Sequence, residues 1–150
     1  MKTILFIAFL VTGCLVGAVC QTHLYHGTWT RLGTSYLFEF DLHLEQGKGN
    51  TVDGYFNWKF VQYDENDTFS VSYYEDKIGM TAKEYVRGTW DAATKTYHLK
   101  GYQKDDPNSI IALDEYLLKV DGNGDIGGET KSHDSWLGRI NAKALVLLDL

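Results

Sequence analysis

Cysteine is nearly absent from this chain: among 150 residues only Cys14 and Cys20 carry a thiol. Both lie in residues 1–20, which we interpret as a secretory signal peptide because Lys2 precedes an apolar run that ends in small residues. Cleavage after Cys20 would leave residues 21–150 without a thiol. Disulfides, thiolate metal sites and cysteine nucleophiles would then be excluded together.

The leader admits two other interpretations. Residues 11–14 resemble the lipobox of bacterial lipoproteins, but the residues that follow Cys14 stay apolar instead of turning polar. A membrane helix would need roughly 20 apolar residues, and this run is shorter. We therefore expect a secreted, extracellular protein that has no membrane association once the signal peptide is removed.

Basic residues are few and scattered. The chain has 14 Lys and Arg against 20 Asp and Glu, a formal net charge of −6. Loss of Lys2 with the leader changes this to 13 − 20 = −7. Nucleic acid and anionic membranes are poor partners for such a chain, because both require clustered Lys and Arg.

Helical periodicity is also missing after the leader, where Pro107 is the only proline. Residues 36–44 and 52–60 instead alternate between apolar and polar side chains, which is typical of half-buried strands. Further strands are expected, each bounded by turn residues, in residues 68–74, 85–90, 96–102, 110–120 and 136–148.

This series of short strands predicts one all-β domain over residues 21–150. Tight connections, such as the hairpin loop expected at 46–50, favour an antiparallel up-and-down β-barrel of about eight strands. A β-sandwich is the alternative. We favour the barrel because closure removes exposed strand edges.

The tripeptide Gly-Thr-Trp occurs twice, at residues 27–29 and 88–90. Glycine allows a neighbouring strand to approach closely, and an indole can close one end of a barrel. We predict that the two copies mark two equivalent places where a strand starts at one rim. Trp29 and Trp90 are either core or site residues at this stage.

The first copy begins a longer resemblance to a known family. Residues 27–35 (GTWTRLGTS) resemble the first strand and turn of avidin and streptavidin. Residues 115–118 (EYLL) and 132–136 (SHDSW) resemble two later strands of the same proteins. The resemblance implies a calycin-type barrel that binds a small ligand at one open end.

In avidins an Asn, Ser, Tyr and Asp set holds the ureido group of biotin, and tryptophans close around it. Carried over by motif, Ser35 matches the serine and Asp134 the aspartate. Tyr116 stands where a tryptophan stacks, and Tyr55 is a match for the tyrosine. Arg31 occupies the place of the asparagine, so the resemblance implies the barrel shape more than biotin binding.

Metal sites are not indicated. Residues 121–125 (DGNGD) lack the glycine and glutamate that an EF-hand loop places at its sixth and twelfth positions, so we expect a hairpin turn. Glu39, Asp41 and His43 share one strand face without matching a known ligand spacing. We expect no metal and no cofactor. Asn66 begins the only N-glycosylation sequon and lies in a polar turn.

Catalytic signatures are missing as well. Residues 132–134 (SHD) are consecutive on a strand and cannot converge into a triad. The sequence contains no Gly-x-Ser-x-Gly, His-Glu-x-x-His or phosphate-binding loop. We therefore predict that the protein is not an enzyme, unless two carboxylates prove to be buried side by side with perturbed pKa values.

The leading hypothesis is a secreted, non-catalytic barrel that binds a small molecule or carbohydrate in an aromatic-lined cavity. The candidate residues for stacking and polar contacts are Ser35, Tyr55, Trp58, Trp90, Tyr116 and Asp134. The rival is an extracellular structural or matrix component whose apolar segment 144–148 could support a homo-oligomer. An open aromatic cavity would favour binding, and a fully packed interior would favour the rival.

Overall fold

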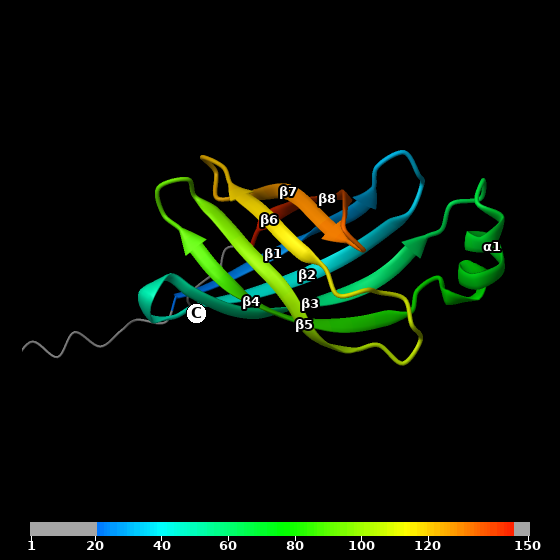
Figure 1. Ribbon diagram of the computed structural model, residues 1–150, viewed down its shortest axis with the longest axis horizontal. Helices are drawn as coiled ribbons and strands as arrows, with labels where there is room; N and C mark the ends of the chain where they lie inside the picture. The colour runs from blue at the N-terminus through cyan, green and yellow to red at the C-terminus, as the bar shows by residue number, and fades with distance from the viewer. Residues whose placement is uncertain (1–20, 146–150) are drawn as a thin grey trace, which may run out of the picture.

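The computed structural model describes residues 21–145 and shows a closed antiparallel barrel (Figure 1). Its elements in chain order are β1 (Gln21–Arg31), β2 (Leu37–Gln46), η1 (Lys48–Asn50), β3 (Thr51–Gln62), α1 (Thr68–Tyr74), η2 (Glu75–Lys77), β4 (Thr81–Asp91), β5 (Thr96–Asp105), β6 (Glu115–Val120), β7 (Ile126–Ser132) and β8 (Ser135–Ala144). Each strand pairs with the next, and β8 returns to pair with β1. The expected eight-strand barrel is confirmed and the sandwich alternative is wrong. The proposed signal peptide and both cysteines lie outside the described residues.

Alternate side chains of the strands fill the middle of the barrel. Phe40 packs edge to face against Phe56 and Trp58, with ring centroids 5.2 and 5.1 Å apart. Phe40, Phe56 and Leu118 are fully buried and contribute the hydrophobic free energy that an interior without disulfides needs. The alternation in residues 36–44 and 52–60 therefore predicted the inward-facing side chains correctly.

The two Gly-Thr-Trp copies do allow close strand approach, but they do not occupy equivalent places. A Cβ on Gly27 would lie 2.2 Å from the carbonyl oxygen of Asn141, and one on Gly88 would lie 1.8 Å from that of His98. Each copy lies toward the end of its strand and not at the start, in β1 and β4. Because β4 runs antiparallel to β1, the two tryptophans lie at opposite ends of the barrel.

The strand expected at 68–74 is wrong, and the segment is α1. Asp67 caps this helix by accepting a 3.1 Å hydrogen bond from the backbone N–H of Phe69. Among its seven residues only Ser70 is buried, so α1 has no apolar stripe that would have identified it. Figure 1 shows α1 beyond the ends of β3 and β4, outside the barrel wall.

Two other strands differ from expectation. The segment expected at 110–120 is extended only over β6, because the Asp106 carboxylate accepts hydrogen bonds from the N–H groups of Ile110 and Ile111 and holds them in a loop. Strand β7 was not predicted, since Gly127 and Gly128 interrupt its alternation. The last strand ends at Ala144, and residues 146–148 of the expected segment lie outside the described part. Within residues 21–145 no helix is long and apolar enough to cross a membrane.

The close approach at Gly88 predicts a specific sensitivity. Gly88→Ala would place a methyl group against the His98 carbonyl of β5, which backbone hydrogen bonds hold in place, so we expect a loss of at least about 2 kcal/mol in the free energy of unfolding. Gly122→Ala is the control, because nothing lies within 4 Å of the added atom. Urea denaturation of both variants measures the difference, and equal stabilities would contradict the packing described here.

Candidate functional site

A cavity lies at each end of the barrel. The cavity beside α1, which we call the helix-end cavity, has a volume of about 370 Å³. The opposite cavity, of about 440 Å³, borders Gln21 and Leu145, where the described part of the chain begins and ends. The helix-end cavity has carboxyl groups in its wall, whereas the described lining of the opposite cavity has none. We therefore take it as the candidate site.

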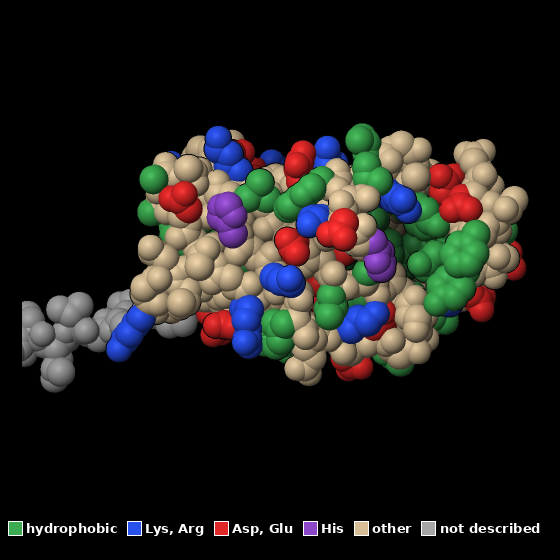
Figure 2. Space-filling view, viewed as in Figure 1, with side chains coloured by type: hydrophobic (Ala, Val, Ile, Leu, Met, Phe, Trp, Pro, Cys, Tyr) green, Lys and Arg blue, Asp and Glu red, His purple; other side chains and the backbone are tan. Residues whose placement is uncertain are grey.

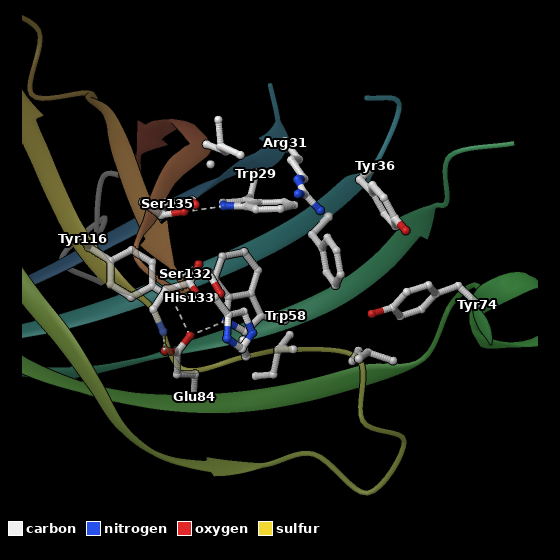
Figure 3. A pocket seen from close by; sticks show the side chains of 18 of the residues that line it. Trp29, Arg31, Tyr36, Trp58, Tyr74, Glu84, Tyr116, Ser132, His133 and Ser135 are labelled. Carbon is white, nitrogen blue, oxygen red and sulfur yellow. Dashed lines mark hydrogen bonds between the residues drawn. The ribbon is translucent and has the colours of Figure 1, made fainter. Parts of the chain in front are cut away.

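Aromatic side chains form one wall of the helix-end cavity. Phe38 packs edge to face between Trp29 and Trp58, at centroid distances of 5.5 and 6.1 Å. At the outer side Tyr36 and Tyr74 meet edge to face at 5.8 Å. Figure 3 shows the two tryptophans along the cavity, with these tyrosines toward α1. The arrangement offers ring edges and faces to an apolar or ring-shaped molecule.

Glu84 lies at the deep end of this cavity, on the inward face of β4, and is fully buried. Its Oε2 accepts hydrogen bonds from the Trp58 indole N–H at 3.1 Å and from the Tyr116 hydroxyl at 2.5 Å. Its Oε1 accepts one from the backbone N–H of Asp114 at 3.1 Å (Figure 3). Three neutral donors thus hold the carboxyl in one position.

Burial raises the pKa of Glu84 from 4.5 to about 7. The hydrogen bonds from Tyr116, Asp114 and Trp58 favour the charged form and offset part of this effect. Gly101 of β5 makes room for the carboxyl, since a Cβ there would lie 2.0 Å from Oε1 of Glu84. The sequence therefore accommodates a carboxyl at a position where an apolar side chain would cost less free energy.

Asp114 supplies a second carboxyl, from the loop that leads into β6. Burial raises its pKa from 3.8 to about 6, while hydrogen bonding with Ser132 and Thr130 and the nearby His133 act in the opposite direction. Asp114 is half-buried and lines the cavity, so a molecule inside can reach it. Within residues 21–145 neither Asp114 nor Glu84 forms an ion pair with Lys or Arg.

The mouth of the cavity is formed by α1 and by the turn between β7 and β8. On α1, Phe69 and Tyr73 stack at 5.6 Å, and Phe69 is 65% exposed. Figure 2 shows hydrophobic side chains gathered at this end of the molecule, beside a hollow. In the facing turn, His133 and Asp134 have φ angles of 47° and 64°, a left-handed conformation that Asp and His adopt more readily than most residues.

The structure brings together only part of the predicted residue set. Trp58 and Tyr116 line the helix-end cavity, whereas Trp90 lines the opposite one, where its ring lies 4.5 Å from that of Tyr97. The other three predicted residues, Ser35, Tyr55 and Asp134, line neither cavity.

These three residues have other surroundings. The Ser35 hydroxyl donates to Asp64 at 3.3 Å, in the connection before α1. Tyr55 lies on the outer face, where the ammonium group of Lys83 is 3.8 Å from its ring centroid. Asp134 has a 97% exposed side chain and pairs with Lys131 at 3.2 Å. Asn66, the predicted glycosylation site, is exposed in the turn before α1.

Sequence reasoning missed both carboxyls. Glu84 could have been found, because it occupies an inward position between Ala82 and Val86 in the alternation of β4. Asp114 has no such signal, since its position depends on how the loop before β6 folds.

Comparison of the chain with protein-family models, with curated proteins and with solved structures finds no match. The eight-strand barrel is consistent with the calycin-type architecture that the sequence motifs imply. A function for this chain therefore has to be argued from the chemistry of the cavity.

The buried carboxyl of Glu84 predicts a distinctive pH dependence of stability. Because its pKa is raised in the folded state, from 4.5 to about 7, the folded protein holds this proton more tightly than the unfolded chain. The free energy of unfolding should fall as the pH rises through this interval, by about 3 kcal/mol for this group. Asp114 adds a fall between 3.8 and about 6.

At acidic pH, Glu84→Gln should be less stable than wild type, because its side-chain NH2 group cannot accept a hydrogen bond and would face an N–H or O–H donor. The variant should also lose most of the pH dependence of the free energy of unfolding. Exposed Glu65→Gln is the matched control and should keep the wild-type slope. Urea denaturation at a series of pH values measures both. If the free energy of unfolding changed with pH equally in Glu84→Gln and wild type, the folded protein would not hold the proton of Glu84 more tightly than the unfolded chain does.

Proposed function

We propose that the protein is a secreted, non-catalytic binding protein that holds a small molecule or carbohydrate in the helix-end cavity. The observation that carries the proposal is an open barrel end whose wall combines Trp and Tyr rings with a few fixed polar groups. Its volume of about 370 Å³ lies within the range of roughly 300–1,000 Å³ that is typical of ligand pockets.

The inner wall of the cavity is held in place without a ligand. The Trp29 indole N–H donates to the Thr130 hydroxyl at 2.7 Å, and that of Trp58 donates to Glu84. Tyr116 stacks on Phe56 at 4.8 Å while its hydroxyl is fixed by Glu84. Rings that are already ordered lose little conformational entropy on binding, which favours affinity.

An avidin-like barrel is the architecture we propose, with a ligand other than biotin. Of the residues carried over from the avidin motifs, only Tyr116 lines the helix-end cavity, whereas Ser35 and Asp134 do not. Its polar lining includes Glu84 and Asp114, carboxyls that the avidin set does not contain at these places. The cavity therefore supports binding by the same shape with different chemistry.

The rival hypothesis of a structural or matrix component receives less support. Such a component needs no open cavity, and an apolar side chain at the buried position of Glu84 would cost less free energy than a carboxyl does.

Enzymatic hydrolysis is the second candidate, favoured by the neighbouring carboxyls of Glu84 and Asp114, both of which have raised pKa values. A glycosidase needs two carboxyls against the scissile bond. Glu84 is fully buried behind Trp58 and Tyr116, so only Asp114 can contact a bound molecule. Binding therefore remains the better supported proposal.

Ligand binding predicts a saturable change in tryptophan fluorescence when residues 21–150 are titrated with biotin, apolar molecules and sugars. The change should be reduced in Trp29→Phe and retained in Trp90→Phe, because these residues line different cavities. Ala112→Phe would fill part of the helix-end cavity and should weaken binding by about tenfold or more. The control is Ala92→Phe, on an exposed turn.

Two outcomes would contradict this proposal. A response across the panel that persists in Ala112→Phe and disappears in Trp90→Phe would place the ligand in the opposite cavity. Release of methylumbelliferone from fluorogenic glycosides, lost in Asp114→Asn, would establish the hydrolytic alternative.

A further inference from the structure

The charges around the helix-end cavity are unbalanced. The carboxyl of Glu84 contacts only neutral donors, and among residues 21–145 no Lys or Arg lies within ion-pair distance of either Glu84 or Asp114. The basic groups of the lining are Arg31 and His133, which are exposed near the mouth. A ligand that brought a positive charge would supply the missing counter-charge at the deep end.

The aromatic wall of the helix-end cavity also favours a positively charged ligand. The faces of Trp and Tyr rings carry partial negative charge and attract an ammonium or guanidinium group, most strongly where water is excluded. Trp58 and Tyr116 flank Glu84 through hydrogen bonds, and Trp29 lies farther along the same wall. Carboxyls and aromatic side chains therefore line one cavity, in which each kind of group favours a cation.

Resting on the proposed function, we propose that the ligands of the helix-end cavity are organic cations: small amines with an aromatic or apolar body. Asp114, which lines the cavity and is half-buried, is the carboxylate that contacts the ammonium group. Glu84 is fully buried and acts through its charge behind Trp58 and Tyr116, as a positioning residue. The body of the ligand packs on the aromatic wall.

Other ligand classes fit less well. An anion would be repelled by the charged form of either carboxyl, and the basic groups of the described lining, Arg31 and His133, are exposed. A neutral sugar could stack on the rings and accept or donate hydrogen bonds, but it would gain nothing from the charged form of either carboxyl.

Cation binding should release protons. A bound ammonium group favours the charged forms of Asp114 and Glu84, whose pKa values in the free protein are raised to about 6 and about 7, so affinity should rise with pH through this range. The other ionisable groups of the lining are Arg31, Asp67, His133, Tyr36, Tyr74 and Tyr116. A positive charge on His133 would also weaken the binding of a cation at low pH, so the variant His133→Asn separates its effect from that of the carboxyls.

The test compares three molecules that share one ring: 2-phenylethylamine, 2-phenylethanol and phenylacetate. Calorimetric titration of wild type at about pH 8 should show the amine binding about tenfold or more tightly than the alcohol, and phenylacetate most weakly. Asp114→Asn should remove the preference for the amine, so that the amine and the alcohol bind with similar affinities. Asp134→Asn, with its 97% exposed side chain, is the matched control.

Proton release provides a readout that needs no variant. Near pH 6.5, the heat of amine binding should differ between two buffers of different ionisation enthalpy, phosphate and the zwitterionic ACES, and the difference should give net proton release that is reduced in Glu84→Gln and retained in His133→Asn. A merely structural role of Glu84 would leave the number of released protons unchanged. Amine binding without proton release would overturn the assignment of the carboxyls.

The failures of the two proposals are distinguishable. If the alcohol, biotin or a sugar binds in the helix-end cavity as tightly as the amine does, binding stands and the cationic class is wrong. If the amine and every other molecule of both panels leave the heat and the fluorescence unchanged, the proposed function fails together with this inference.

Discussion

The carboxyl of Glu84 inside a closed barrel is the constraint on which the site depends. A carboxyl removed from water needs hydrogen-bond donors, and the chain provides them from three separate places: Trp58 on β3, Tyr116 on β6 and the backbone of Asp114 before β6. Meeting this need fixes two aromatic rings and one loop around a single point. The deep end of the helix-end cavity is therefore ordered by a polar group and not by apolar packing alone.

The two ends of the barrel differ in the contacts that their tryptophans make, although a Gly-Thr-Trp sequence lies near each end. At one end Trp29 donates to Thr130 and leaves an open cavity with carboxyls at its base. At the other end Trp90 packs on Tyr97 in a cavity whose described lining holds no carboxyl. The same tripeptide supports tight strand pairing in both places, so function depends on what surrounds each tryptophan.

Much of the barrel could be predicted from alternation, because in residues 36–44 and 52–60 every inward position is apolar. α1 could not, since a seven-residue helix that buries only Ser70 leaves no periodic signal. Of the site, Trp58 and Tyr116 were predicted, the first from its place on an aromatic strand face. Glu84 was detectable as a charge on the inward face of β4, whereas the position of Asp114 depends on a loop held by a local hydrogen bond to Asp106 and a long-range one to Glu84.

The helix-end cavity holds two carboxyls that ionise at a higher pH than ordinary carboxyls do, and a bound cation should shift both back toward the charged form. Carbon-13 NMR of the side-chain carboxyls, with Glu84 and Asp114 assigned by substitution, measures this shift. Titration midpoints of about 7 and about 6 are expected in the free protein, both lowered when 2-phenylethylamine is added. Midpoints at the ordinary values of 4.5 and 3.8 in the free protein would contradict it.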